Sequence, residues 1–148
     1  MTLAAGRLPP RRRRRTSNWL TATIFVALGV AALGAWVAYG AMHYRELEQR
    51  AIAITGGAPD RGRDALRRYG CVGCHVIPGV RGAHGLVGPS LAGIARRMYV
   101  AGVLPNTPDD MMRWIRDPRG VDPLTAMPNT GVTDNAARDI AAYLYTLR

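Results

Sequence analysis

The sequence predicts an all-α protein in which a single transmembrane helix precedes a small helical domain. Three observations lead to this prediction. Residues 16–42 contain no charged side chain, and this run exceeds the roughly 20 helical residues that cross a bilayer. Beyond residue 59, three segments combine capping residues with apolar side chains at helical spacing. No segment shows a convincing strand pattern.

The first element is the transmembrane helix at residues 16–42, which follows a basic leader at residues 1–15. Trp19 lies near one end of the apolar run, and Trp36 and Tyr39 lie near the other, as expected at the two membrane interfaces. The leader contains six arginines, and such charges stay on the cytoplasmic side. We therefore predict a cytoplasmic N-terminus, with the downstream domain outside the cytoplasm.

A cleaved signal peptide is the alternative to a retained anchor. The basic start and the sequence Ala38-Tyr39-Gly40 fit such a peptide, whose apolar segment usually has about 7 to 15 residues. The greater length of the apolar run favours retention.

The remaining elements follow in order. The membrane helix continues to about residue 54 and ends at a hinge, residues 55–59, which contains two glycines and a proline. Thr107 is placed to cap a helix whose first turn contains Asp109 and Asp110. In the last helix, apolar residues recur at spacings of three and four. The domain spans residues 60–148, and its predicted helices are 60–69, 108–116 and 134–147.

The pentapeptide Cys71-Val72-Gly73-Cys74-His75 carries the strongest functional signal. Two thiols at this spacing can each add to one vinyl group of a haem, and the imidazole that follows can bind its iron. We therefore expect one covalent haem c held by Cys71 and Cys74, with His75 as an axial ligand.

Two other interpretations of the CxxC sequence are a zinc site and a dithiol redox pair. A structural zinc site needs four ligands, and the chain has only these two cysteines. A thioredoxin-like pair belongs to a βαβ pattern, which is absent from this sequence. Both interpretations are weaker than haem attachment.

Met127 is the expected second axial ligand. It lies in a turn-rich segment before Pro128, where a loop can present the thioether to iron. Met98, Met111 and Met112 are rivals, and a methionine at position 127 that only fills a core gap is the simpler alternative.

Residues 60–148 resemble a class I cytochrome c. The resemblance rests on the pentapeptide, on Val87-Gly88-Pro89-Ser90-Leu91-Ala92-Gly93 and on Met127-Pro128. The segments 101–108, 113–118 and 127–129 are similar to the cytochrome c domain fused to subunit II of some bacterial cytochrome c oxidases, although the copper-binding domain of that subunit is missing.

The resemblance implies roles for further residues. The Pro89 carbonyl is expected to accept a hydrogen bond from His75, and Gly62 is expected to contact Tyr143 where the first and last helices cross. Trp114 is expected to reach a haem propionate, with an ordinary buried tryptophan as the alternative. Haem attachment in this family places the domain on the periplasmic side of a bacterial cytoplasmic membrane.

The net charge of +10 does not indicate a nucleic-acid partner. Six of the basic residues belong to the leader, which runs directly into the apolar segment. From residue 60 onward the chain has twelve arginines and eight aspartates, so the domain itself is only moderately basic. The basic leader suits anionic lipid headgroups instead. Arg81, Arg96 and Arg97 are candidates for steering an acidic partner, or form a solvated basic face.

The sequence thus predicts a membrane-anchored electron carrier with no substrate of its own, passing single electrons from a quinol-oxidising complex to a haem-copper oxidase. One alternative is a permanent subunit of an oxidase or of a membrane dehydrogenase complex. A second is a haem sensor or peroxidase with an open iron site, which requires that Met127 does not bind.

Overall fold

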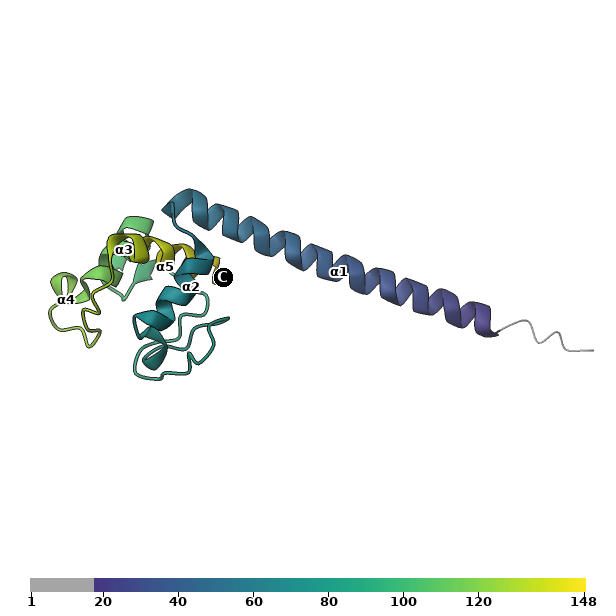
Figure 1. Ribbon diagram of the computed structural model, residues 1–148, viewed down its shortest axis with the longest axis horizontal. Helices are drawn as coiled ribbons and strands as arrows, with labels where there is room; N and C mark the ends of the chain where they lie inside the picture. The colour runs from purple at the N-terminus through teal and green to yellow at the C-terminus, as the bar shows by residue number, and fades with distance from the viewer. Residues whose placement is uncertain (1–17) are drawn as a thin grey trace, which may run out of the picture. The chain divides into compact units, whose positions relative to one another are not determined.

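The computed structural model describes residues 18–148, so the basic leader at residues 1–15 lies outside the described residues. The elements are α1 (Asn18–Thr55), α2 (Pro59–Arg68), the 3₁₀ turns η1 (Cys71–Gly73) and η2 (Ile94–Arg96), strands β1 (Tyr99–Val100) and β2 (Leu104–Pro105), α3 (Pro108–Arg116), α4 (Pro118–Val121) and α5 (Asp134–Thr146). The predicted all-α class is confirmed, and the three predicted domain helices correspond to α2, α3 and α5 (Figure 1).

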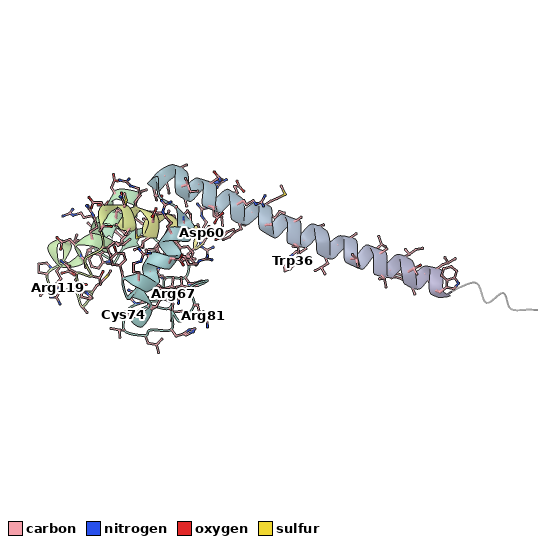
Figure 2. The ribbon with its side chains drawn as sticks, in the orientation of Figure 1. Trp36, Asp60, Arg67, Cys74, Arg81 and Arg119 are labelled. Carbon is pink, nitrogen blue, oxygen red and sulfur yellow. The ribbon has the colours of Figure 1, made fainter. Side chains whose placement is uncertain are left out.

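The chain divides into two compact units, with the boundary between Gly40 and Ala41. The first unit holds most of the apolar run of α1, whose side chains are exposed. Helix α1 is long and apolar enough from Trp19 to cross a membrane. Trp36, labelled in Figure 2, is one of its exposed aromatic residues.

The second unit begins within α1, before the predicted domain start at Asp60. Ala51, with 1% of its surface exposed, belongs to the hydrophobic core of this unit, and Thr55 is also buried. Thr55 Oγ1 donates a hydrogen bond to the Ala51 carbonyl and accepts one from the Gly57 N–H. The last turn of α1 is therefore part of the domain.

The segment predicted as a hinge, residues 55–59, packs against α5. A Cβ atom on Gly57 would lie 2.3 Å from the Arg138 carbonyl oxygen, so only glycine allows this approach. The next residue, Ala58, donates its N–H to Asp139 Oδ1 at 2.7 Å. The backbone of the segment is thus held at two successive residues.

The core of the domain forms where α2 crosses α5 (Figure 1). Leu66 and Ile140 are almost fully buried there, and α5 is buried along nearly its whole length. A Cβ atom on Gly62 would lie 1.9 Å from the Asp139 carbonyl oxygen, so the two helix backbones touch at this point. The three atoms nearest to that Cβ position belong to Asp139 and Ile140, and the contact of Gly62 with Tyr143 stays a prediction.

Tyr143 contacts the loop that follows the pentapeptide. Its hydroxyl donates to the Pro78 carbonyl at 2.7 Å and lies close to Gly79, which has a φ of +75°. A Cβ atom on Gly79 would come within 2.5 Å of that hydroxyl oxygen. Tyr143 therefore fixes the loop after the pentapeptide to α5.

The helix ends follow the capping residues in the sequence. Thr107 accepts from the Asp110 N–H at 3.2 Å and Thr133 accepts from the Ala136 N–H at 3.3 Å, at the starts of α3 and α5. The N-cap residue of α2, Ala58, has no side-chain oxygen that could accept such a bond. Asp139 of α5 supplies the missing acceptor, because Ala58 is the N-cap residue of α2.

The sequence analysis predicted no strand, and this prediction was wrong for one short hairpin. Strands β1 and β2 pair in antiparallel fashion, Tyr99 with Pro105 and Val100 with Leu104. The turn between them holds Ala101 at φ 52° and Gly102 at φ 78°. Two positive φ values in succession suit a tight hairpin turn, but Ala-Gly is a weak sequence signal for it.

Asn106 joins this hairpin to its surroundings. Its amide nitrogen donates to the carbonyls of Ile94 at 2.9 Å and Arg97 at 2.8 Å, and its amide oxygen accepts from the Tyr145 hydroxyl at 3.0 Å. Burial and the nearby charge of Asp110 raise the pKa of Tyr145 to about 12, so the hydroxyl stays protonated and able to donate. The hairpin is therefore fixed to both η2 and α5.

We expect Asp139→Asn to lower the free energy of unfolding by about 1–3 kcal/mol at neutral pH, because Arg61 donates to both carboxylate oxygens, at 2.8 and 3.0 Å. Burial raises the pKa of Asp139, but the hydrogen bonds from Arg61 and Ala58 outweigh burial and leave the pKa below its usual value. This stabilisation is present above the unfolded-state pKa of about 4 and disappears as pH falls through the lower folded-state pKa.

Denaturant titrations of the full-length protein between acid and neutral pH measure this effect. Asp64→Asn, at an exposed position of α2, is the control and should change the free energy by less than about 0.5 kcal/mol. Equal stability of the two variants at neutral pH would show that the Asp139 pair does not support the fold.

Candidate functional site

The pentapeptide follows α2 directly. Gly70, with φ 77°, ends the helix, and η1 then carries Cys71 to Gly73. The His75 N–H donates to the Cys71 carbonyl at 3.0 Å, so the backbone folds into a tight turn. Figure 2 shows Cys74 in this segment and Arg67 on the helix before it. The turn brings both thiols and the imidazole to one cavity.

The cavity has a volume of about 480 Å³ and mainly apolar walls. Pockets that hold cofactor-sized molecules usually measure about 300–1,000 Å³. Helices α2, α3 and α5 contribute Leu66, Trp114 and Ile140 to the walls. All six residues that the sequence singled out for a cofactor line this cavity: Cys71, Cys74, His75, Pro89, Trp114 and Met127.

His75 is held by the segment that follows it. The Nδ1 of its imidazole lies 2.7 Å from the Pro89 carbonyl oxygen, which can only accept, so in the neutral imidazole Nδ1 carries the proton and Nε2 offers its lone pair to a metal. The segment itself is fixed by the Gly88 N–H, which donates to the Cys74 carbonyl at 2.8 Å. The backbone thus sets both the position and the tautomer of the imidazole.

Gly88 is a site residue whose role was not predicted. A Cβ atom at this position would lie 2.3 Å from Cε1 and 2.7 Å from Nδ1 of His75. Gly85 is similarly confined, since its Cβ would lie 2.3 Å from the Gly73 carbonyl oxygen. The glycine before Pro89 is therefore required by the imidazole beside it.

The two cysteines are half-buried and not joined by a disulfide. Burial raises the pKa of the Cys71 thiol, and the neighbouring Cys74 raises it further, against a smaller opposite effect of a backbone hydrogen bond. No cluster of three or more histidine, cysteine or acidic side chains that would bind a metal ion occurs in residues 18–148.

Met127 lies on the loop between α4 and α5 and is half-buried in the cavity wall. Of its predicted rivals, Met98 is 80% exposed and Met112 is not part of the wall. Met111 of α3 does line the cavity and is buried, so two methionines border the same space.

Trp114 is buried and lines the cavity from α3. Arg97 and Asp122 are the charged residues of the described wall. The guanidinium group of Arg97 donates to the carbonyls of Ser90 and Ala92, which orders the loop after Pro89. Arg81 and Arg96 are exposed and do not line the cavity.

The arrangement fits a haem c group. Two thiols lie next to an imidazole whose second nitrogen is occupied by a carbonyl, and a thioether borders the same apolar space. Thiols are the groups that attach haem through thioether bonds, and imidazole and thioether are ligands of haem iron.

Comparisons with known proteins agree with this arrangement. A family model described as Cytochrome c matches residues 59–148. Cytochrome c oxidase subunit 2 of Alkalihalophilus pseudofirmus is 30% identical over 89 residues, which cover 60% of this chain and 25% of that protein. The protein of the same name from Bacillus sp. strain PS3 is 29% identical over 89 residues, covering 57% of this chain and 25% of that protein.

The chain therefore spans about a quarter of the length of these curated relatives. No solved structure matches it.

We expect Gly88→Ala to displace the His75 imidazole, because the added Cβ overlaps the ring. Such overpacking costs about 1–3 kcal/mol, and it should weaken the hydrogen bond to Pro89. Denaturant unfolding of the haem-loaded protein measures the loss of stability. Gly73→Ala is the matched control, since a Cβ there meets no atom within 4 Å. The steric explanation is wrong if both variants unfold at the same denaturant concentration.

Proposed function

The chain belongs to the cytochrome c family, and from this membership we propose that it carries single electrons along a bacterial respiratory chain, from a quinol-oxidising complex to a haem-copper terminal oxidase. Electron transfer is the general function that the family implies. The donor and the acceptor are the proposed part. The observation that supports the proposal best is the shared cavity of Cys71, Cys74, His75 and Met127.

Each residue has a defined part in this proposal. When bound, haem c supplies an iron centre that takes up and releases one electron. Cys71 and Cys74 attach the group, His75 Nε2 and the Met127 sulfur bind its iron, and the Pro89 carbonyl keeps the imidazole basic. Trp114 lines the wall on the α3 side, and its indole N–H would donate to a propionate of the bound group.

The walls of the cavity limit the chemistry to electron transfer. His75 and Met127 would both bind the haem iron, which would leave no coordination position for a substrate, and the walls around them are mainly apolar. The same two residues would hold the iron in both oxidation states, so the rearrangement on electron transfer would be small. The protein alone is therefore proposed to catalyse no reaction.

The location follows from helix α1. It is a candidate membrane span near the N-terminus, and we propose that it anchors the protein in the bacterial cytoplasmic membrane in a single pass. The arginines of residues 1–15 favour a cytoplasmic N-terminus, which puts the haem domain on the periplasmic side.

A permanent subunit of a larger complex is the second candidate function. Two observations favour it. Both relatives named cytochrome c oxidase subunit 2 align with this domain over only a quarter of their length, so in them the domain is joined to a longer chain. In addition, Gly57 and Ala58 of the segment predicted as a hinge are packed against α5 within the second compact unit, so this segment is not a free linker.

The spectrum of a Met127→Ala variant tests the ligand assignment. Oxidised wild-type protein should show the weak charge-transfer band of an iron–sulfur bond at the red end of the visible spectrum, and the variant should lose it. The reduced variant should also bind carbon monoxide, because its sixth position is open.

Two methionine variants serve as controls for that experiment. Met98→Ala changes an exposed residue and should keep the band, and Met111→Leu preserves the volume of the other cavity methionine and should keep it as well. Loss of the band only in Met111→Leu would show that Met111 of α3, and not Met127, is the ligand. A wild-type protein that lacks the band and binds carbon monoxide would instead favour a haem sensor or peroxidase.

Purification in mild detergent separates the two electron-transfer candidates. A mobile carrier should elute apart from other haem proteins, whereas a permanent subunit should remain with an oxidase or dehydrogenase at constant stoichiometry. Visible spectra and mass spectrometry of the peak fractions measure the outcome. Retention of a complex through added salt would exclude the mobile carrier, since weak electrostatic contacts dissociate under that condition.

A further inference from the structure

The loop that carries Met127 is closed by a side-chain network. Asn129, two residues after Met127, donates its amide nitrogen to Asp117 Oδ1 at 2.8 Å. Its amide oxygen accepts from the Arg119 N–H at 3.3 Å. Both ends of the amide are therefore occupied, and the segment after Met127 is tied to the corner between α3 and α4.

This corner is a fixed point of the domain. Asp117 ends α3 and caps α4, where its Oδ1 accepts from the Gly120 N–H at 3.0 Å. Pro118, the next residue, is almost fully buried in the core. A Cβ atom on Gly120 would lie 1.9 Å from Asp117 Oδ2, so glycine lets the carboxylate lie over α4. Figure 2 labels Arg119 on this short helix.

The rest of the loop is held mainly by bonds within itself. The Leu124 N–H donates to Asp122 Oδ1 at 3.0 Å, and the Met127 N–H donates to Thr125 Oγ1 at 3.2 Å. Leu124 is 94% exposed, so the tip of the loop contributes little to the core. These local bonds shape the turn but do not attach it to another helix. The bonds of Asn129 attach the loop to the corner between α3 and α4.

We propose that Asn129 and Asp117 form a clamp that keeps the Met127 thioether in the haem cavity, with Asn129 as a positioning residue. The inference rests on the proposed role of Met127 as an axial ligand. Without the clamp, the loop would open more often and withdraw the thioether. Local opening of this kind is set by the few contacts that hold a loop, and here one side chain supplies two of them.

Competition with an external ligand measures how often the loop opens. Imidazole binds ferric iron only when the thioether has left, so its apparent affinity rises in proportion to the open fraction. Loss of one or two exposed hydrogen bonds should increase that fraction about 2- to 10-fold. The imidazole concentration that removes half of the charge-transfer band should fall by the same factor.

The experiment compares Asn129→Ala with Asn135→Ala in full-length, haem-loaded protein in detergent. Asn135 is an exposed asparagine in the first turn of α5, so its replacement is the same chemical change away from the clamp. The midpoint for imidazole should fall about 2- to 10-fold in Asn129→Ala and stay at the wild-type value in Asn135→Ala. Denaturant unfolding of both variants verifies that the domain remains folded.

A second variant, Asn129→Asp, places a carboxylate against Asp117. Repulsion between the two charges should lower the imidazole midpoint at least as far as Asn129→Ala, and added salt should reverse part of that effect. A truncation that merely weakened packing would show no such salt dependence.

The outcomes separate the clamp from the ligand assignment. If wild type has the band and Asn129→Ala and Asn135→Ala share one imidazole midpoint, the clamp is wrong while Met127 remains the ligand. If wild type lacks the band, the ligand assignment fails and the clamp fails with it.

Discussion

The crossing of α2 and α5 at Gly62 is the constraint on which the rest of the structure depends. Because the backbones touch there, Leu66 and Ile140 meet in the core, and Asp139 reaches the start of α2. The pentapeptide leaves from the end of α2, and the Met127 loop enters α5 at its start. One close contact between helices therefore determines the separation of the two segments that supply the proposed ligands. Any side chain at residue 62 would force them apart.

The helices of the domain were predictable because their signals are local. Proline in the first turn, threonine caps and helical spacing act within a few residues of one another, and α2, α3 and α5 begin near where these signals place them. The hairpin was not predictable, because Ala101 is an unusual residue at a positive φ and because Asn106 fixes the segment through bonds to η2 and α5, which are distant in the sequence. Helix α4 is a single turn, too short to show a period.

The site shows the same division between local and distant causes. Cys71, Cys74 and His75 are joined by sequence spacing, so their common cavity follows from one turn of backbone. The steric demand of His75 on Gly88 and the bond from Asn129 to Asp117 join partners 13 and 12 residues apart, and the spacing of these residues does not predict either contact. Met111 also borders the cavity, and this position follows from how α3 packs in the domain.

The burial of Ala51 and Thr55 has a practical consequence for anyone who wishes to study the domain in water. Cutting the chain at Asp60 would discard an α1 turn that completes the core, and would expose the apolar surface beneath it. It would also remove the Ala58 N–H, which donates a hydrogen bond to Asp139. The partly buried carboxylate would then keep hydrogen bonds from Arg61 alone. A fragment that retains the native packing therefore begins near Ala41, where the compact unit starts.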